Sequence, residues 1–141
     1  MPTPESKALR VTGFRAAGIH CGVKESGLDL ALLASDRPAS VAGVFTRSSV
    51  VGAPVVLCRE RVRSGKARAI VVNSGVSNVA MGERGLSDSR EMASRTAAAL
   101  GVDPEQVLMA STGVIGEPLP MACIRRGIRT AARPRPSRSS S

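Results

Sequence analysis

The chain has 141 residues, of which 43% are hydrophobic, and a formal net charge of +9. This length allows one domain with a hydrophobic core, and the composition excludes a wholly disordered chain. No apolar run is as long as a membrane-spanning helix, and the first residues lack the apolar segment of a secretory signal. We therefore expect one domain, in a cytoplasmic protein without a membrane partner.

The positive charge is concentrated at the C-terminal end. Residues 125–141 contain six of the twenty lysines and arginines and no acidic residue. Such a segment can bind nucleic acid or another acidic partner without sequence specificity. It has no aromatic residue on which a base could stack, so a site that reads a nucleic-acid sequence is not expected. Residues 133–141, rich in Arg, Pro and Ser, cannot bury a core and are expected to form a disordered tail.

Short strands separated by turns are predicted for the first half of the chain. Residues 1–10 form a polar lead-in to a domain that extends over residues 11–132. Apolar runs predict strands within residues 12–23, 28–34, 39–46, 53–60 and 68–73. The Ser-Asp-Arg-Pro sequence at 35–38 predicts a turn, and a short helix ended by Gly65 is predicted at 59–64.

The second half of the chain alternates helices with a strand. The predicted elements are a helix at 87–100, a strand at 106–111 and a helix that starts near Pro120 and weakens near Ala131. Ser87 or Asp88 can cap the first of these helices, with Glu91 completing a capping box. Gly101 stands where a helix of this length would end in a left-handed residue. Strands followed by strand–helix alternation predict a mixed α/β fold.

Small polar residues follow two of the predicted strands. Ser111, Thr112 and Gly113 end one strand, and Asn73, Ser74 and Gly75 end another. Each motif alone is more typical of an ordinary turn. Two such strand ends with a helix between them predict two walls of one site, because ligands of α/β sheets lie at strand carboxyl ends. A threonine hydroxyl and a glycine N–H are the donors that an acyl-transfer site needs for a developing oxyanion.

Other kinds of chemistry have little support in the sequence. Cys21, Cys58 and Cys123 are too widely spaced for a metal site and are expected to be reduced, mostly buried thiols. His20 adjoins Cys21, but a catalytic Cys–His pair depends on geometry in space, and a structural role is favoured. No glycine loop matches a phosphate-binding pattern, so no nucleotide cofactor is expected, and the cysteine spacing predicts no metal site.

Several segments match, in order and spacing, those of one enzyme family. The segments are Gly13–Ile19, Asp29–Leu33, Ser35–Asp36, Ala42–Thr46, Ala53–Glu60, Arg68–Gly75, Ala110–Gly116 and Leu119–Met121. Together they resemble the N-terminal part of the bifunctional ornithine acetyltransferase / glutamate N-acetyltransferase family of arginine biosynthesis. The resemblance covers residues 11–130, which is less than half of a full-length family member.

The resemblance implies a layered α/β/β/α fold, of which this chain holds only the N-terminal portion. It implies transfer of an acetyl group from N-acetylornithine, or in some members acetyl-CoA, to glutamate. The family's precursor cuts itself before a threonine, which becomes the nucleophile of a β chain, and the assembly expected is a heterotetramer. The family's oxyanion hole maps onto the Thr112 hydroxyl and the Gly113 N–H. A possible pocket wall maps onto Asn73, Ser74, Gly75 and Asn78.

Two departures from the family pattern affect these expectations. Val76 and Met81 replace residues that are usually Asn or Gly and Thr, so hydrogen bonds from those positions are lost. Nothing after Ala132 matches the self-cleavage threonine, which predicts a shifted reading frame, an early stop or a sequencing artefact, and a chain inactive on its own. Two alternatives remain: a small basic protein that binds nucleic acid or an acidic partner through its C-terminal end, and a degenerate family member that aggregates.

Overall fold

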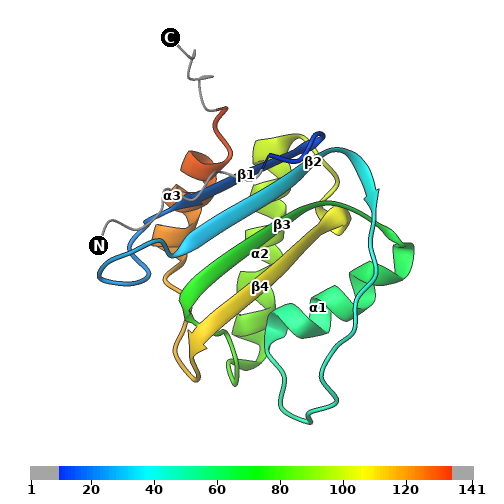
Figure 1. The fold of residues 1–141 in the computed structure, drawn as a ribbon. Coiled ribbons are helices and arrows are strands. Elements are labelled where there is room, and N and C mark those ends of the chain that lie inside the picture. Colours follow the sequence, from blue (N-terminus) through cyan, green and yellow to red (C-terminus); the bar gives the residue numbers. More distant parts are fainter. Residues whose placement is uncertain (1–9, 135–141) are drawn as a thin grey trace, which may run out of the picture.

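The computed structural model describes residues 10–134, which form a four-stranded sheet covered by helices (Figure 1). The strands are β1 (Phe14–Ile19), β2 (Leu30–Ser40), β3 (Lys66–Val76) and β4 (Val107–Val114). The helices are α1 (Ala53–Arg61), α2 (Gly82–Leu100) and α3 (Met121–Ala131), with 3₁₀ turns at Val62–Ser64 and Pro104–Gln106. The predicted mixed α/β class is confirmed.

The strands lie in the order β1-β2-β3-β4. The first three pair in antiparallel fashion, whereas β4 runs parallel to β3. A parallel pair needs a crossover connection, which α2 supplies between β3 and β4. The carboxyl ends of these two strands therefore meet at the same end of the sheet.

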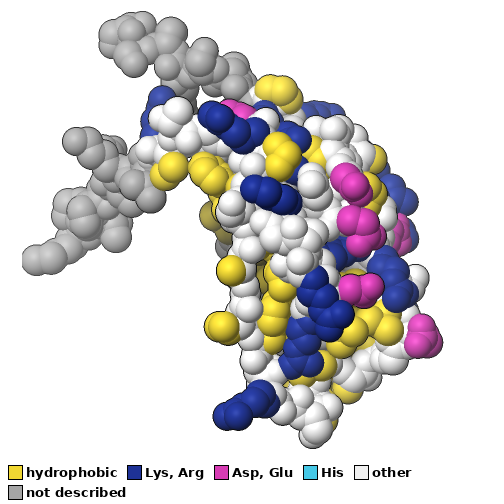
Figure 2. Space-filling view, turned by 90° about the vertical axis from the view of Figure 1, so that its right-hand side faces the viewer, with side chains coloured by type: hydrophobic (Ala, Val, Ile, Leu, Met, Phe, Trp, Pro, Cys, Tyr) yellow, Lys and Arg dark blue, Asp and Glu magenta, His cyan; other side chains and the backbone are white. Residues whose placement is uncertain are grey.

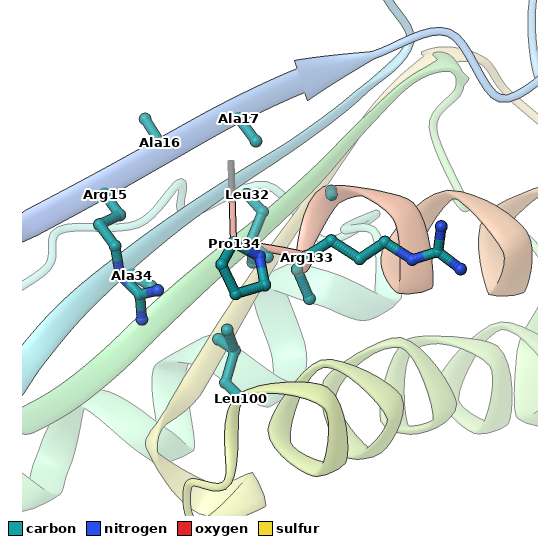
Figure 3. Close-up of a pocket in the computed structure, with 10 residues that line it drawn as sticks. Arg15, Ala16, Ala17, Leu32, Ala34, Leu100, Arg133 and Pro134 are labelled. Atoms are coloured by element: carbon teal, nitrogen blue, oxygen red, sulfur yellow. The ribbon is translucent and has the colours of Figure 1, made fainter. Parts of the chain in front are cut away.

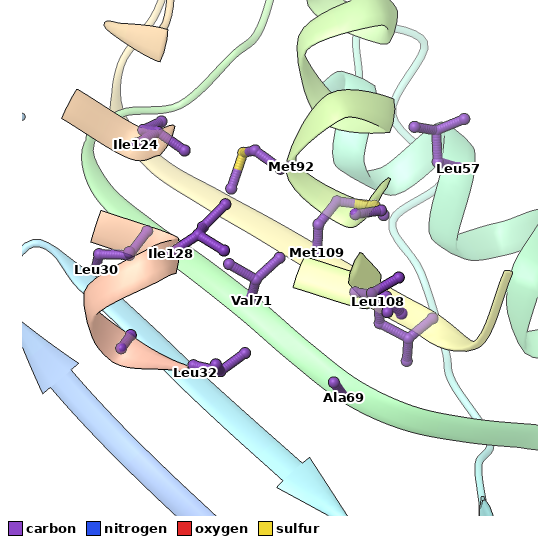
Figure 4. Packing of buried hydrophobic residues seen from close by; sticks show 14 of the residues in the cluster. Leu30, Leu32, Leu57, Ala69, Val71, Met92, Leu108, Met109, Ile124 and Ile128 are labelled. Atoms are coloured by element: carbon purple, nitrogen blue, oxygen red, sulfur yellow. The ribbon is translucent and has the colours of Figure 1, made fainter. Parts of the chain in front are cut away.

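The core lies between the sheet and helices α2 and α3. Alternate strand residues point toward the helices, among them Leu32 and Val71, which are 5% and 0% exposed. Met92 of α2 and Ile124 and Ile128 of α3 complete this cluster (Figure 4). All three of these helix residues are buried, so the two helices are held to the sheet by apolar packing.

Helix α1 covers the free edge of β4. The Cys58 thiol donates to the Met109 carbonyl at 3.2 Å, and the Met109 N–H donates to Cys58 Sγ at 3.4 Å. The buried Arg61 side chain donates through Nη1 to the carbonyls of Val107 at 2.7 Å and Pro104 at 2.9 Å. The unpaired backbone groups of an edge strand can pair with other chains. These contacts provide hydrogen-bond partners for part of the β4 edge.

The opposite face of the sheet is left open by the helices that the structure describes. Phe14 and Leu33 lie on it and are 44% and 39% exposed, and Ala16 and Ala31 are exposed as well. Figure 2 is seen from the right-hand side of Figure 1, the side on which α1 lies, and shows hydrophobic side chains at the surface among lysine and arginine side chains. Residues 10–134 thus form one helical layer and one sheet layer, and the outer face of the sheet exposes apolar side chains.

The predicted turn at 35–38 and the predicted strand at 39–46 are wrong. Both are replaced by β2, which continues to Ser40 through an irregularity between Ala34 and Ala39. Residues 41–52 contain no helix or strand. A residue distant in the sequence stabilises the irregular segment, because the Arg68 Nε donates to the Ser35 carbonyl at 3.1 Å.

The predicted strand at 53–60 is in fact helix α1. A short apolar run does not separate strand from helix by periodicity. Pro54 stands in the first turn, where its missing N–H has no cost, and the buried residues Leu57, Cys58 and Arg61 recur at helical spacing.

Helix α2 also begins earlier than predicted, at Gly82, so neither Ser87 nor Asp88 caps it. Asp88 lies within the helix, 3.8 Å from Arg84, and Glu91 pairs with arginine side chains and completes no capping box. The predicted end is confirmed, because Gly101 has φ +69° and its N–H donates to the Ala97 carbonyl. The last helix starts after Pro120 as predicted.

The predicted lead-in and tail fall mostly outside the described residues, which include Arg10, Arg133 and Pro134 of those segments. None of the helices in the described part of the chain combines the length and the apolar character required of a membrane span.

Candidate oxyanion site

The two small polar motifs lie side by side at the carboxyl end of the parallel pair. The register of β3 and β4 places Asn73 opposite Ser111, Ser74 opposite Thr112 and Gly75 opposite Gly113. The motifs are far apart in the sequence, and the α2 crossover returns the chain so that they meet. The geometry therefore brings together the residues that the sequence singled out.

Gly113 can only be glycine in this position. Its φ is +129°, a conformation that side chains rarely adopt, and a Cβ there would lie 2.5 Å from the Gly75 carbonyl oxygen. Gly75 has φ +111°, and a Cβ on it would lie 2.9 Å from Cγ of Lys24. The missing side chains allow β3, β4 and the loop before β2 to approach one another closely.

The Gly113 N–H points away from β3. The Met109 N–H turns to the outer side of β4, where it meets Cys58, whereas the Val114 carbonyl turns inward and accepts the Ser77 N–H at 2.9 Å. Backbone groups alternate along a strand, and the register shows no shift between Val107 and Val114. Gly113 therefore presents its N–H on the same outer side as Met109.

Thr112 lies beside this donor and is exposed. Its side chain belongs to the open face of the sheet, because its partner Ser74 alternates with the buried Asn73. The hydroxyl of Thr112 and the N–H of Gly113 thus occupy the corner between the open face and the outer edge of β4. A carbonyl oxygen at this corner could accept hydrogen bonds from both groups.

The predicted wall residues divide into a buried frame and a partly exposed surface. Asn73 is 0% exposed: it accepts a hydrogen bond from Ser111 Oγ at 2.5 Å and donates to the Val76 carbonyl at 2.9 Å. Asn78 is 1% exposed and donates through Nδ2 to the Gly85 carbonyl at 2.9 Å and to Ser89 Oγ at 2.8 Å. Ser74 and Gly75 are partly exposed, and the Ser74 N–H donates to the Asp29 carbonyl.

Ser77 fixes the end of β4 and was not singled out from the sequence. Its N–H and its hydroxyl both donate to the Val114 carbonyl, each at 2.9 Å, and the residue is 8% exposed. These two bonds hold the residue directly after Gly113. A serine in this place gives no signal in the sequence, because its partner is 37 residues away.

Asp29 orders the loop of residues 20–28, and its role was not predicted either. The carboxylate is 2% exposed and accepts the N–H groups of Cys21, Gly22 and Lys24 at 2.7 to 3.1 Å. Burial alone would raise its pKa, but these donors outweigh burial and lower the pKa to about 2. Because the side chains of Val23 and Lys24 lie against Gly75, Asp29 indirectly fixes one side of the site.

The neighbouring residues His20 and Cys21 do not form an activated nucleophile. His20 Nδ1 lies 2.7 Å from the Gly27 carbonyl oxygen and 3.4 Å from Asp29, so its ring is engaged within the loop. Burial and the Asp29 carboxylate raise the pKa of Cys21 to about 11, which disfavours the reactive thiolate. The geometry agrees with a structural role.

One cavity adjoins the candidate site and another lies away from it. One of about 430 Å³ opens between β4, α1 and the segment 41–52, and its mostly apolar lining includes Ser77, Ala110 and Ser111. It therefore adjoins the corner formed by Thr112 and Gly113. A smaller cavity of about 270 Å³ lies between β1, β2 and the end of α3 (Figure 3) and touches none of the site residues.

Comparison with known sequences gives a match to one family over most of the chain. The model of the ArgJ family matches residues 15–139. The "Arginine biosynthesis bifunctional protein ArgJ" of Caldanaerobacter subterraneus subsp. tengcongensis is 49% identical over 120 residues, which are 85% of this chain and 30% of that protein. The protein of the same name from Geobacter sulfurreducens is 50% identical over 121 residues, 85% of this chain and 31% of its own length.

Solved structures agree with these sequence matches. The arginine biosynthesis bifunctional protein of Bacillus halodurans has a TM-score of 0.82 and 41% identity, and the match covers 86% of this chain and 66% of that chain. Ornithine acetyltransferase from Mycobacterium tuberculosis, solved in complex with ornithine, has a TM-score of 0.84 and 39% identity over the same shares. The chain spans about 30% of the length of the curated relatives it matches.

Proposed function

The chain belongs to the ArgJ family, and on that premise we propose that it supplies the oxyanion hole of an N-acetyltransferase of arginine biosynthesis. The observation that supports this most is Gly113 itself, which lies beside the exposed Thr112 in a place where a side chain would collide with Gly75. Rigid donors of this kind stabilise the negative charge that develops on a carbonyl oxygen during acyl transfer.

The reaction proposed is the transfer of an acetyl group from N-acetylornithine, or from acetyl-CoA, to glutamate. A threonine hydroxyl attacks the acetyl carbonyl carbon, and the carbonyl oxygen becomes an oxyanion held by the Thr112 hydroxyl and the Gly113 N–H. Ornithine leaves as the amine, and the glutamate amine then removes the acetyl group from the threonine. The complex of the Mycobacterium tuberculosis relative with ornithine supports this substrate class.

The remaining parts of the machinery are proposed to lie outside this chain. The nucleophilic threonine belongs to a β chain formed by self-cleavage in the family, with which the α part assembles as a heterotetramer in the cytoplasm. Ser74 and Gly75 would line the substrate pocket, whereas Asn73 and Asn78 hold the strand ends in place. The 141-residue chain alone is then expected to show no acetyl transfer, because oxyanion donors without a nucleophile leave little catalysis.

A chimeric enzyme tests the proposed role of Thr112. Residues 15–130 of this chain would replace the matching N-terminal part of the Geobacter sulfurreducens relative, which is 50% identical there. We expect the chimera to transfer acetyl from N-acetylornithine to glutamate. The Thr112→Val variant should have a kcat lower by a factor of about 100 or more. Thr130→Val, at an exposed threonine of α3, is the matched control. Equal rates for the two variants would remove Thr112 from the mechanism.

The alternative of a basic binding protein has weaker support. Arg125, part of the basic C-terminal end, donates through Nε and Nη2 to the Glu91 carboxylate at 2.6 and 3.0 Å. This cation is therefore engaged by α2 within the fold and is not free for an acidic partner.

A further inference from the structure

Two thiols that are far apart in the sequence lie together where the loop of residues 20–28 meets α3. Cys21 belongs to this loop and Cys123 to the first turn of the helix, and both are free and partly exposed. The third cysteine, Cys58, is buried under α1 against Met109. The first two thiols have no part in the proposed acyl transfer.

Contacts at two glycines show how close the thiols are. Cys21 Sγ lies 3.1 Å from the place that a Cβ on Gly127 would take, and Cys123 Sγ lies 3.5 Å from the corresponding place on Gly22. Cys123 Sγ is also 3.7 Å from the Gly22 carbonyl oxygen. Residues 123 and 127 are one turn apart on the same helix face, where Cβ atoms are about 5–6 Å apart. Both thiols therefore lie against one face of α3, the arrangement that a disulfide between this loop and the helix requires.

The surroundings of the two sulfurs differ. Arg126 Nη2 lies 3.5 Å from Cys123 Sγ, and a guanidinium is a typical neighbour of cysteines that react with oxidants. Burial and the Asp29 carboxylate raise the pKa of Cys21, so this thiol stays protonated at neutral pH. This difference suits Cys123 for the first reaction with an oxidant and Cys21 for the second.

We propose that Cys21 and Cys123 form a disulfide when the chain meets a peroxide, and that this bond ties the loop of residues 20–28 to α3. The Cys123 thiolate attacks one peroxide oxygen, an S–O bond forms, the O–O bond breaks, and hydroxide leaves, which gives a sulfenic acid. The Cys21 sulfur then attacks the Cys123 sulfur, the S–S bond forms, the S–O bond breaks, and the departing hydroxide takes the Cys21 proton to leave as water. Two thiols are oxidised and one hydrogen peroxide is reduced to two waters.

The disulfide would act next to the candidate site. The loop already contacts Gly75 through Val23 and Lys24, so a bond to α3 would fix the other side of the same loop. This consequence for the site rests on the proposed function, whereas formation of the disulfide does not.

Oxidation of the purified chain tests the proposal. The chain would be treated with one equivalent of hydrogen peroxide in native buffer, alkylated and digested without reductant, and its peptides identified by mass spectrometry. We expect loss of two hydrogens from the intact monomer, a peptide pair joined through Cys21 and Cys123, and a free thiol at Cys58. The same treatment in guanidinium chloride should favour Cys21–Cys58, the closer pair in the sequence, because the shorter loop is easier to close.

Two variants separate the steps of the reaction. Cys21→Ser should leave a sulfenic acid on Cys123 that a cyclic diketone traps, whereas Cys123→Ser should leave Cys21 as a free thiol. The proposal is wrong if the native chain keeps all three thiols, forms only intermolecular dimers, or gives the same linkages with and without guanidinium chloride.

Discussion

Gly113 faces Gly75 across the parallel pair so closely that a side chain on Gly113 would overlap the Gly75 carbonyl. Gly113→Ala should therefore lower the free energy of unfolding by about 3 kcal/mol, the sum of a positive φ and a steric clash. Gly116→Ala is the matched control, because Gly116 also has a positive φ of +78° but no heavy atom lies near its missing Cβ. Chemical denaturation should show a loss of only about 1 kcal/mol for the control. Equal losses would mean that the close approach of the strands has no energetic weight.

The buried carboxylate of Asp29 should make the fold sensitive to acid. Its pKa is about 2 in the folded chain and 3.8 in the unfolded one, so it stabilises the fold above pH 4. That contribution, about 2 kcal/mol, should be lost as the pH falls from about 4 to 2. Glu91, whose pKa is lowered to about 2 chiefly by its hydrogen bond with Arg125, titrates in the same range.

The measurement for Asp29 is therefore a difference between two proteins. Urea unfolding of the wild type and of Asp29→Asn would be compared from pH 2 to pH 7. We expect the gap between them to be widest near pH 7 and to narrow below pH 4. A gap that does not change with pH would show that the Asp29 charge is not what stabilises the loop.

The buried Arg61 should stabilise the β4 edge. Arg61→Met keeps much of the apolar stem but removes the donor from the carbonyls of Pro104 and Val107, so a loss of about 2 kcal/mol in unfolding free energy is expected. Arg63→Met, two residues further on at an exposed position, should change stability by no more than about 0.5 kcal/mol. Thermal unfolding of both variants under the same conditions distinguishes an edge contact from a general effect of positive charge.

The open sheet face should make the isolated chain associate. Leu33 lies on this face and is 39% exposed, and Leu33→Glu should reduce association in sedimentation velocity runs over a concentration series. Val44→Glu is the control, because Val44 is 99% exposed but lies in the segment 41–52, outside the sheet. Suppression by both variants alike would point to net charge as the cause.

Those parts of the fold that depend on local signals could be predicted from the sequence. The strand within β3 follows from its β-branched apolar run, and the end of α2 follows from Gly101, whose φ of +69° needs no distant partner. The start of α2 was misplaced because Ser87 and Asp88 imitate a cap that the chain does not use. The helix predicted at 59–64 ends at Gly65 as expected, but the first part of α1 was predicted as a strand, because its apolar face is decided by contact with β4, which the local sequence does not contain.

The same division holds within the candidate site. Thr112 and Gly113 were singled out because their residue types have a chemical meaning at a strand end. Ser77 and Asp29 were not, because a serine or an aspartate acquires its role from hydrogen bonds to segments that only the fold brings near. Whether Thr112 acts on a substrate stays a prediction that the chimeric enzyme would test.

The crossover from β3 through α2 to β4 has a consequence for the order of events during synthesis. Both glycine-containing strand ends belong to one uninterrupted stretch, residues 66–114. In a longer family member this stretch leaves the ribosome before any residue that follows it. Both strands that carry the candidate oxyanion site are therefore complete in the emerging chain while the proposed nucleophile is still untranslated.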